Sequence, residues 1–464
     1  MSRLTISMIA PTACPDYHWQ LMKRILIWIA VGFAGLILVG YIVFSFWLNS
    51  YLRGDSFRTL LNRKTSIFLH ADGQYLPFHW TGFSVYSDGY QAHGKPGTVF
   101  RDLQADQIRA EFQPQGIFHH AWEIDELTIQ RLQVNLTPTT LDVEFPPTSS
   151  AGSAHSSWVP NRLDLRKTQI NDLNLTWSAP SQTANIRQTR AIIEPEDRAW
   201  IISAHGGQLR QTGWPVLNID HLRLRYQAPE LFITDGQLKL SDSENVNITG
   251  QANFSSQPVV DLQIKINGVV VTPFLPADWR AKLKGIANGD ARLSGRFDNL
   301  ETITATGKLN LTGAQLEALP VLDKIALFTR TEQFRQLVFQ KASMDFIWMK
   351  SKLTINHILM ESEGLLRIEG DCIVAQEKLD GLFQVGVAPT SLRWIPGSQA
   401  RVFTVERNGY VWTPVRVTGP LVNLKEDLSQ RLITAAGTEI LEGVKGSLEK
   451  GAKDLLDLLK SPAP

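Results

Sequence analysis

The densest group of side chains that could carry out chemistry lies at residues 119–126. It combines two histidines with three carboxylates: His119, His120, Glu123, Asp125 and Glu126. Imidazole and carboxylate groups can bind zinc or act as acid and base catalysts. If the segment is a strand, however, adjacent histidines point to opposite faces of the sheet and cannot share a metal ion. The pattern therefore favours a solvated strand edge over a zinc site.

The chain lacks the short motifs that mark common catalytic sites. It contains no Gly-x-Ser-x-Gly, no His-Glu-x-x-His and no Gly-x-x-x-x-Gly-Lys-Ser/Thr. Its two cysteines, Cys14 and Cys372, have no metal-ligand spacing. A net charge of +1 gives no support for nucleic-acid binding, which normally shows a basic patch. We therefore expect a protein that is not an enzyme, uses no cofactor or metal and binds no nucleic acid.

An apolar segment, residues 25–48, indicates where the protein works. Its 24 residues carry no charge, and as a helix rising about 1.5 Å per residue they would cross the roughly 30 Å hydrocarbon core of a bilayer. A cleaved signal peptide is the alternative, but it would have a shorter apolar stretch and an Ala-x-Ala-like cleavage site. The sequence therefore predicts a membrane anchor, whose residues include Ile25, Trp28, Tyr41, Trp47 and Leu48.

The charges beside this segment leave its orientation less clear. Lys23 and Arg24 precede it, whereas Arg53, Arg58 and Arg63 follow it. The positive-inside rule counts short loops and discounts large domains that translocate anyway. We therefore expect a short cytoplasmic tail, residues 1–24, and an exported C-terminal part. Met22 with its following charges is also an alternative start to Met1.

From about Thr65 to Val422 the hydrophobic pattern has a period of two. Residues 127–136, 222–226 and 260–266 alternate apolar and polar side chains almost throughout. Such alternation gives a strand one apolar and one polar face. Asp235-Gly236, Asn267-Gly268 and Asn408-Gly409 are typical turn sequences. The pattern predicts a mainly β, antiparallel architecture, with a flexible loop at 146–158.

Two segments have a helical period instead. Residues 316–328 suggest a short amphipathic helix, and the tail, residues 426–464, suggests a longer one. The tail helix could cap the last strands, or it could contact a second membrane or a partner. Its lysines are balanced by acidic residues, so it lacks the basic polar face of an interfacial helix. We therefore favour the cap.

An apolar-x-Gly phrase followed by alternating strands recurs at residues 248–250, 305–307 and 368–370. A repeated hairpin-like unit indicates a sheet that grows by stacking. Between Asn247 and Leu424 the chain resembles the AsmA-like family of membrane-anchored exported proteins. The resemblance rests on four segments: 289–296, 307–314, 355–370 and 412–424. The last segment ends in Asn423-Leu424, where the family commonly has Asn-Pro.

The resemblance implies an elongated, curved antiparallel sheet that forms a groove with an apolar inner face. Related proteins are thought to approach both membranes of a diderm bacterium and to conduct lipids. On this basis residues 55–240 would form the N-terminal part of the groove, and 241–425 the AsmA-like C-terminal region. The implied location is the bacterial inner membrane, with a single span and the C-terminal domain in the periplasm. The implied partners are the membrane and lipid, with envelope proteins as further candidates.

The chain has 13 tryptophans, which could pack in a core or line the groove for acyl chains. The candidate lining residues are Trp80, Trp122, Trp177, Trp214, Trp348 and Trp394. Two functions follow. The first is a β-groove that binds or conducts lipid in support of outer-membrane biogenesis. The second is a scaffold with a closed β core that binds a protein partner. A solid core without a continuous apolar channel would favour the scaffold, and an envelope hydrolase has the least support.

Overall fold

A computed structural model describes most of the chain beyond the apolar segment. The described residues are 55–98, 100–113, 115–116, 121–136, 162–179, 182–255, 257–296, 299–317, 332–393 and 397–435, with single positions at 39, 40, 42, 43, 46 and 50. The predicted anchor residues Ile25, Trp28, Tyr41, Trp47 and Leu48 lie outside them, as does the predicted loop 146–158. Within the described part, no helix is long and apolar enough to cross a bilayer.

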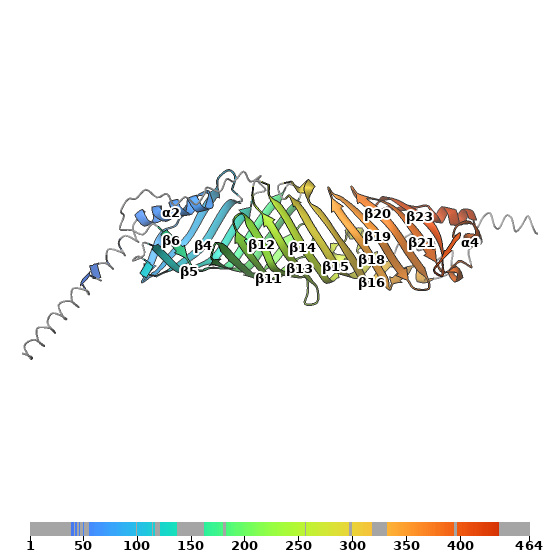
Figure 1. The fold of residues 1–464 in the computed structure, drawn as a ribbon, viewed down its shortest axis with the longest axis horizontal. Helices are drawn as coiled ribbons and strands as arrows, with labels where there is room; N and C mark the ends of the chain where they lie inside the picture. The colour runs from blue at the N-terminus through green and yellow to red at the C-terminus, as the bar shows by residue number, and fades with distance from the viewer. Residues whose placement is uncertain are drawn as a thin grey trace, which may run out of the picture.

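The predicted mainly β fold is confirmed: the described residues form one curved sheet of 24 strands, stacked along the length of the molecule (Figure 1). The strands of the first half are β1 (Ala71–Tyr75), β2 (Phe78–Thr81), β3 (Ser84–Gly94), β4 (Phe100–Gln113), β5 (Ala121–Leu136), β6 (Arg162–Leu165), β7 (Thr168–Ala179), β8 (Gln182–Glu196), β9 (Ala199–His205), β10 (Gln208–Gln211), β11 (Leu217–Gln227) and β12 (Glu230–Lys239). Those of the second half are β13 (Asn245–Asn253), β14 (Val259–Val270), β15 (Leu283–Arg296), β16 (Thr304–Glu317), β17 (Gln336–Phe339), β18 (Lys341–Met349), β19 (Lys352–Ser362), β20 (Leu366–Ala375), β21 (Lys378–Val387), β22 (Val405–Arg407), β23 (Tyr410–Pro420) and β24 (Lys425–Glu426).

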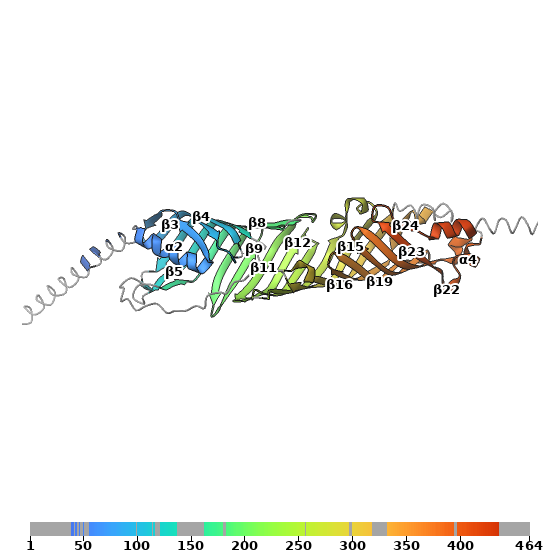
Figure 2. The ribbon, with the colours of Figure 1, turned by 90° about the horizontal axis from the view of Figure 1, so that it is seen from above.

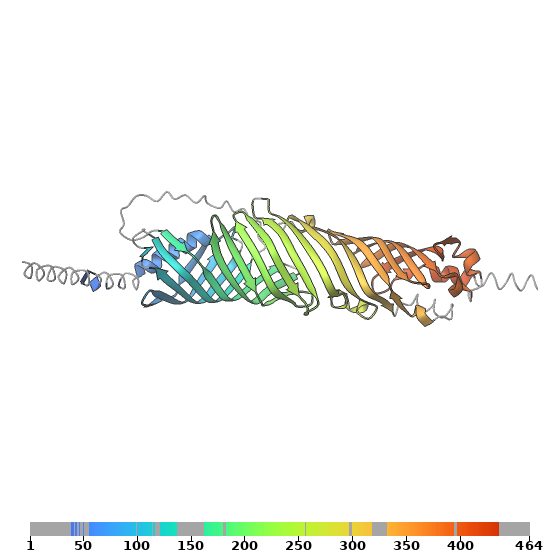
Figure 3. The same ribbon diagram turned by 60° about the horizontal axis from the view of Figure 1, so that its bottom comes forward.

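Consecutive strands pair with each other along most of the sheet, as Figure 3 shows for the run from β11 to β16. The prediction of an antiparallel sheet is wrong at one place, because β5 pairs in parallel with both β6 and β7. The sheet is therefore mixed. A parallel pair needs a crossover connection of about a dozen residues or more. The segment 137–161 between β5 and β6 is long enough to supply it.

Two of the predicted turns are bends within strands. Asp235-Gly236 lies inside β12 and Asn267-Gly268 inside β14, and the pairing register shifts beside each of them. A β-bulge uses the same residue types as a turn, because it also needs unusual backbone angles. Gly268 has φ of 65°, which a side chain would strain. Asn408-Gly409 does form the predicted turn, between β22 and β23.

Helix α2 (Asp55–Leu69) corrects the prediction that strands begin near Thr65. Its buried or half-buried stripe runs through Phe57, Leu61, Thr65 and Leu69, at the four-residue spacing of one helix face. The helix lies along the sheet near one end of the molecule (Figure 2). The predicted helix at 316–328 lies mostly outside the described residues, and its first residues belong to β16.

The remaining helical elements are short and lie in loops. They are η2 (Thr272–Phe274), η3 (Ala277–Trp279), η4 (Leu300–Thr302), η5 (Glu332–Phe334), η6 (Pro389–Leu392) and α4 (Ser398–Arg401). The start of the predicted tail helix is also present, because residues 428–435 are helical. Leu428, Leu432 and Ala435 are buried there, which confirms an amphipathic helix over this stretch. Residues 436–464 lie outside the described chain.

Candidate functional site: one apolar face across the sheet

One face of the sheet carries apolar side chains from strand to strand. Residues directly opposite each other in neighbouring strands point to the same face. From β13 to β20 one such row is formed by Ile248, Ile264, Ala291, Gly307, Phe346, Ile355 and Cys372. A second row, from β11 to β19, is formed by Leu224, Ile233, Gly250, Leu262, Leu293, Ala305, Trp348 and Leu353. We call this surface the apolar face.

The middle of the apolar face is left partly uncovered. Large side chains there, such as Ile248, Leu262, Ile264, Leu293 and Leu309, are only half-buried. None of these five belongs to a cluster of buried side chains in the described residues. A partly exposed apolar surface that continues over many strands often marks a site for a ligand or a partner. The described side chains therefore cover the middle of the face less completely than its two ends.

Helix α2 covers the apolar face at the N-terminal end. The Phe57 ring is fully buried and lies 5.5 Å from Trp122 and 6.0 Å from Trp80, between ring centroids. The Tyr75 backbone N–H donates to Asn62 Oδ1 at 2.9 Å. Burial raises the pKa of Tyr90 to about 12, so its hydroxyl stays protonated. Protein side chains therefore fill the face at this end.

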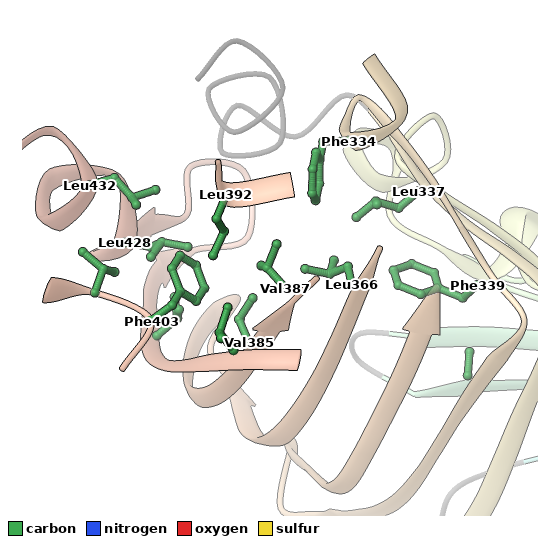
Figure 4. Close-up of a cluster of buried hydrophobic side chains, with 14 of the residues drawn as sticks. Phe334, Leu337, Phe339, Leu366, Val385, Val387, Leu392, Phe403, Leu428 and Leu432 are labelled. Carbon is green, nitrogen blue, oxygen red and sulfur yellow. The ribbon is translucent and has the colours of Figure 1, made fainter. Parts of the chain in front are cut away.

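The C-terminal end is filled by a larger cluster (Figure 4). Leu366, Val385 and Val387 rise from the strands and meet Leu428 and Leu432 of the tail helix. Beside them, Phe334, Leu337 and Phe339 are almost completely buried. The tail helix thus caps the last strands, as far as its described residues show.

A contact between distant loops bridges the two rims of the sheet. Trp279, in the loop after β14, donates its indole N–H to the Leu421 carbonyl oxygen at 3.2 Å. Leu421 follows β23, at the rim where β15 ends, whereas Trp279 precedes β15 at the other rim. The two residues can meet only because the sheet curls. We call this contact the strap.

Replacing Trp279 with phenylalanine should loosen the strap while keeping an aromatic ring. Phenylalanine cannot donate the hydrogen bond to the Leu421 carbonyl oxygen, which is worth about 1 kcal/mol. Its loss should increase the population of the locally open state, and so the amide exchange rate, by about fivefold. Hydrogen–deuterium exchange of the amides of Leu421 and Asn423 measures this opening. Trp214→Phe is the matched control, because its exposed ring contacts only Phe274 among the described aromatic rings. Unchanged exchange at 421–423 in Trp279→Phe would rule the strap out.

Gly307 on the apolar face makes room for a flat aromatic ring. A Cβ added to Gly307 would lie 2.7 Å from Cε1 of Phe346 on the paired strand. That approach is too close for real side chains, so the ring needs the glycine to lie against the backbone. Gly307 therefore lets the Phe346 ring lie flat against the backbone of the sheet. The copy of the phrase at 248–250 differs, because a Cβ added to Gly250 would meet the backbone of Asp261 and Leu262 rather than a ring.

The opposite face of the sheet is polar. Its residues in β13 to β18 include Asn247, Lys265, Asp290, Lys308 and Asp345, which lie directly opposite one another. They line a hollow of about 960 Å³. Arg292 and Asp261 form a two-bond ion pair beside it, at 2.8 and 2.6 Å. Ile264, Ala291, Gly307 and Phe346 of the apolar face also line this hollow, so charged and apolar groups share it.

His221 on β11 bridges two carboxylates. Its Nδ1 lies 2.8 Å from Asp220 Oδ2, and its Nε2 lies 3.1 Å from Asp235 Oδ2. The hydrogen bond with Asp220 raises the pKa of His221 above 6.5. Burial lowers this pKa, and the negative charge of Asp235 raises it, so the net shift is upward. Lys239 and His221 lower the pKa of Asp220, so this carboxylate stays ionised near neutral pH.

The raised pKa of His221 predicts a pH-dependent contribution to stability. A group whose pKa is higher in the folded protein than in the unfolded chain stabilises the fold when it is protonated. This contribution is complete at pH values below the pKa in the unfolded chain, about 6.5, and it is lost as the pH rises through the pKa in the folded protein. The difference in unfolding free energy between the unmodified protein and His221→Gln should therefore be larger at about pH 5.5 than at about pH 8.5. Denaturant melts at both pH values test this. A difference independent of pH would contradict it.

The predicted lining tryptophans separate into three groups. Trp80 and Trp122 pack against α2 in a buried cluster. They therefore follow the core-packing interpretation of the tryptophans and do not line an open groove. Trp177 is half-buried opposite Leu136, and Trp348, 37 % exposed, stands in a row of the apolar face. Trp214 is 54 % exposed in the turn after β10, and Trp394 lies outside the described residues.

Aliphatic side chains supply most of the apolar face, and the sequence reading did not single them out as a site. The signal was present in the alternating segments, such as 260–266, but the cross-strand register that aligns them is not visible in one strand alone. Trp200, opposite Tyr226, was also missed. So was Trp279, which has no periodic pattern around it.

The polar group at 119–126 forms ion pairs where it is described. Arg166 lies 3.5 Å from Glu123 and 3.6 Å from Asp125, and Lys167 lies 3.6 Å from Glu126. His119 and His120 lie outside the described residues. In the part of the chain that the structure covers, no group of three or more His, Cys, Asp or Glu side chains could hold a metal ion.

Comparison with known proteins adds no relative. No family model, no curated protein and no solved structure matches this chain.

Proposed function

We propose that this protein is a membrane-anchored, non-enzymatic protein whose apolar face binds lipid acyl chains and conducts lipid between membranes of a bacterial envelope. The observation that carries the proposal is the half-buried middle of the face, which lies between two ends filled by protein. Each CH₂ group removed from water contributes about 0.8 kcal/mol, so an acyl chain laid along the face would be stabilised relative to one in water.

The dimensions of the uncovered part suit acyl chains. From β11 to β19 the second row crosses seven strand-to-strand steps of about 4.8 Å each, or about 34 Å. One leaflet of a bilayer core is about 15 Å thick, which is the length that one acyl chain covers. The face could therefore hold two acyl chains end to end. This length favours a passage for lipid over a pocket for one small molecule.

The membrane anchor in this proposal rests on the apolar segment 25–48. The described apolar residues within it, Val39, Ile42, Val43 and Phe46, are helical and exposed. Exposed apolar side chains on a helix are what a lipid-facing span would present. The periplasmic location and the resemblance to AsmA-like proteins stay predictions.

A closed scaffold that binds a protein partner is the alternative. The filled C-terminal cluster suits it, but the described residues bury the rows between the ends only in part. Lipid binding explains those rows directly, so we favour it.

Photocrosslinking tests the proposal. The purified chain is incubated with a phospholipid that carries a photoactivatable acyl chain, illuminated and digested. Crosslinks are expected on apolar-face residues of β12 to β19, such as Leu262 and Leu293. Neighbours on the polar face, such as Gln263 and Arg292, should remain unmodified. Crosslinks spread evenly over both faces, or none, would refute the proposal.

A further inference from the structure

Helix α2 has two faces of different character. Its inner face packs on the sheet through Phe57 and Leu61, and Asn62 accepts a backbone hydrogen bond there. Its outer face is formed by the exposed residues Asp55, Thr59, Arg63, Lys64, Ile67 and Phe68. The apolar members of the outer face lie in its last turn, and each of the two cations lies four residues, about one turn, before one of them.

The exposure of that last turn is extreme. Ile67 is 63 % exposed and Phe68 is 81 % exposed. No other large apolar side chain in the described chain is more exposed than Phe68. Single exposed apolar residues are common on protein surfaces. Two adjacent large apolar side chains that are both more than half exposed are instead typical of a surface that binds a partner or a membrane.

The neighbouring cations have no partner among the residues that the structure describes. Arg58, earlier on the helix, pairs with Asp55 at 2.8 Å. Arg63 and Lys64 are exposed, and the structure records no ion pair or hydrogen bond for either among the described residues. Free cations beside exposed Ile and Phe side chains are the combination that binds anionic lipid surfaces.

We propose that the outer patch of α2, formed by Arg63, Lys64, Ile67 and Phe68, docks on the surface of an anionic phospholipid bilayer. The inference rests on the proposed anchor at 25–48. Only residues 49–54 separate that segment from α2, and six residues reach at most about 20 Å even when fully extended. The anchor therefore holds the patch close to the bilayer, where even a weak contact becomes effectively intramolecular.

Docking would orient the rest of the molecule. The inner face of the same helix covers the apolar face at Trp80 and Trp122. A bilayer bound to the outer face would therefore lie one helix diameter, about 10 Å, from the N-terminal end of the apolar face. Lipid leaving the bilayer would meet that end first.

Spin labelling of the full chain in vesicles tests this docking. The background variant is Cys14→Ser, and Cys372 stays unlabelled because it is buried, with its thiol pKa raised to about 11 by that burial. A nitroxide is attached at Phe68→Cys, and at Lys308→Cys on the polar face as the matched control. The vesicles contain phosphatidylcholine with or without phosphatidylglycerol. Accessibility to oxygen and to a water-soluble nickel complex is then measured.

We expect the label at position 68 to be shielded from the nickel complex and accessible to oxygen when phosphatidylglycerol is present, with position 308 open to water. Adding Arg63→Gln and Lys64→Gln should weaken the shielding by about fivefold for each charge removed. Equal water accessibility at both positions would overturn the proposal. Shielding that is independent of lipid charge and accompanied by spin–spin broadening would instead indicate a second copy of the chain.

The readout is separate from lipid binding on the apolar face. The same measurement in an Ile264→Asp background should still show position 68 docked. If the chain binds lipid but position 68 does not dock, only the α2 proposal is refuted. If position 68 docks but the apolar face of the unmodified chain binds no lipid, only the proposed function is refuted.

Discussion

Ile264→Asp should reduce lipid binding by about 100-fold or more while the protein remains folded. Ile264 is half-buried in the middle of the apolar face, opposite Ile248 and Ala291. Without lipid the new carboxylate can reach water, so folding should tolerate it. Under a bound acyl chain it would lose its hydration, which costs several kcal/mol for a charge without a partner. Titration with a fluorescent phospholipid measures the affinity.

Gln263→Asp is the matched control, because it introduces the same charge one residue away on the same strand. Gln263 is exposed on the polar face, opposite Thr249 and Arg292. Its substitution should leave lipid affinity within about twofold of the unmodified protein. Circular dichroism should show both variants folded. Equal lipid affinity for the two variants would mean that the apolar face does not hold the acyl chain.

Leu432→Ala should lower the free energy of unfolding by about 2–5 kcal/mol. Leu432 is 2 % exposed and packs in the C-terminal cluster, where truncation leaves a cavity among Leu428, Leu392 and Phe403. Arg431 anchors the same turn by donating to Thr413 Oγ1 at 3.1 Å and to the Pro414 carbonyl oxygen. Denaturant unfolding followed by tryptophan fluorescence measures the loss.

The adjacent residue provides the control. Ile433 is 55 % exposed on the same helix, so Ile433→Ala should change stability by less than about 0.5 kcal/mol. If the two variants were equally stable, residues 428–435 would not be a structural cap. A role for this helix in contacting a second membrane or a partner would then need to be considered again.

The strand content could be predicted from sequence because each strand carries its own alternating pattern. Residues 260–266 show it within β14 without reference to any neighbour. The parallel pairing of β5 with β7 could not be predicted, because it depends on the path of a connection and not on the residues of either strand. Helix α2 was missed because its inner face is partly polar, through Asn62 and Thr65, which weakens the helical period.

The apolar character of the candidate site could be predicted from the sequence, but the residues that form it could not. One apolar face was expected, yet tryptophans were chosen to line it because they are the largest apolar side chains. Trp80 and Trp122 instead pack under Phe57, a contact that requires a helix the sequence reading did not include. The rows of Ile and Leu become visible only when the register aligns Leu262 with Leu293 and Ile248 with Ile264.

The measurement that tests the central claim most directly is mass spectrometry of the lipids retained by the full chain after mild purification from a diderm bacterium. We expect reproducible phospholipid in at least equimolar amount, which is lost in Ile264→Asp and kept in Gln263→Asp. A chain that carries no lipid and takes up none when phospholipid is added would contradict it, and would favour a scaffold that binds a protein partner.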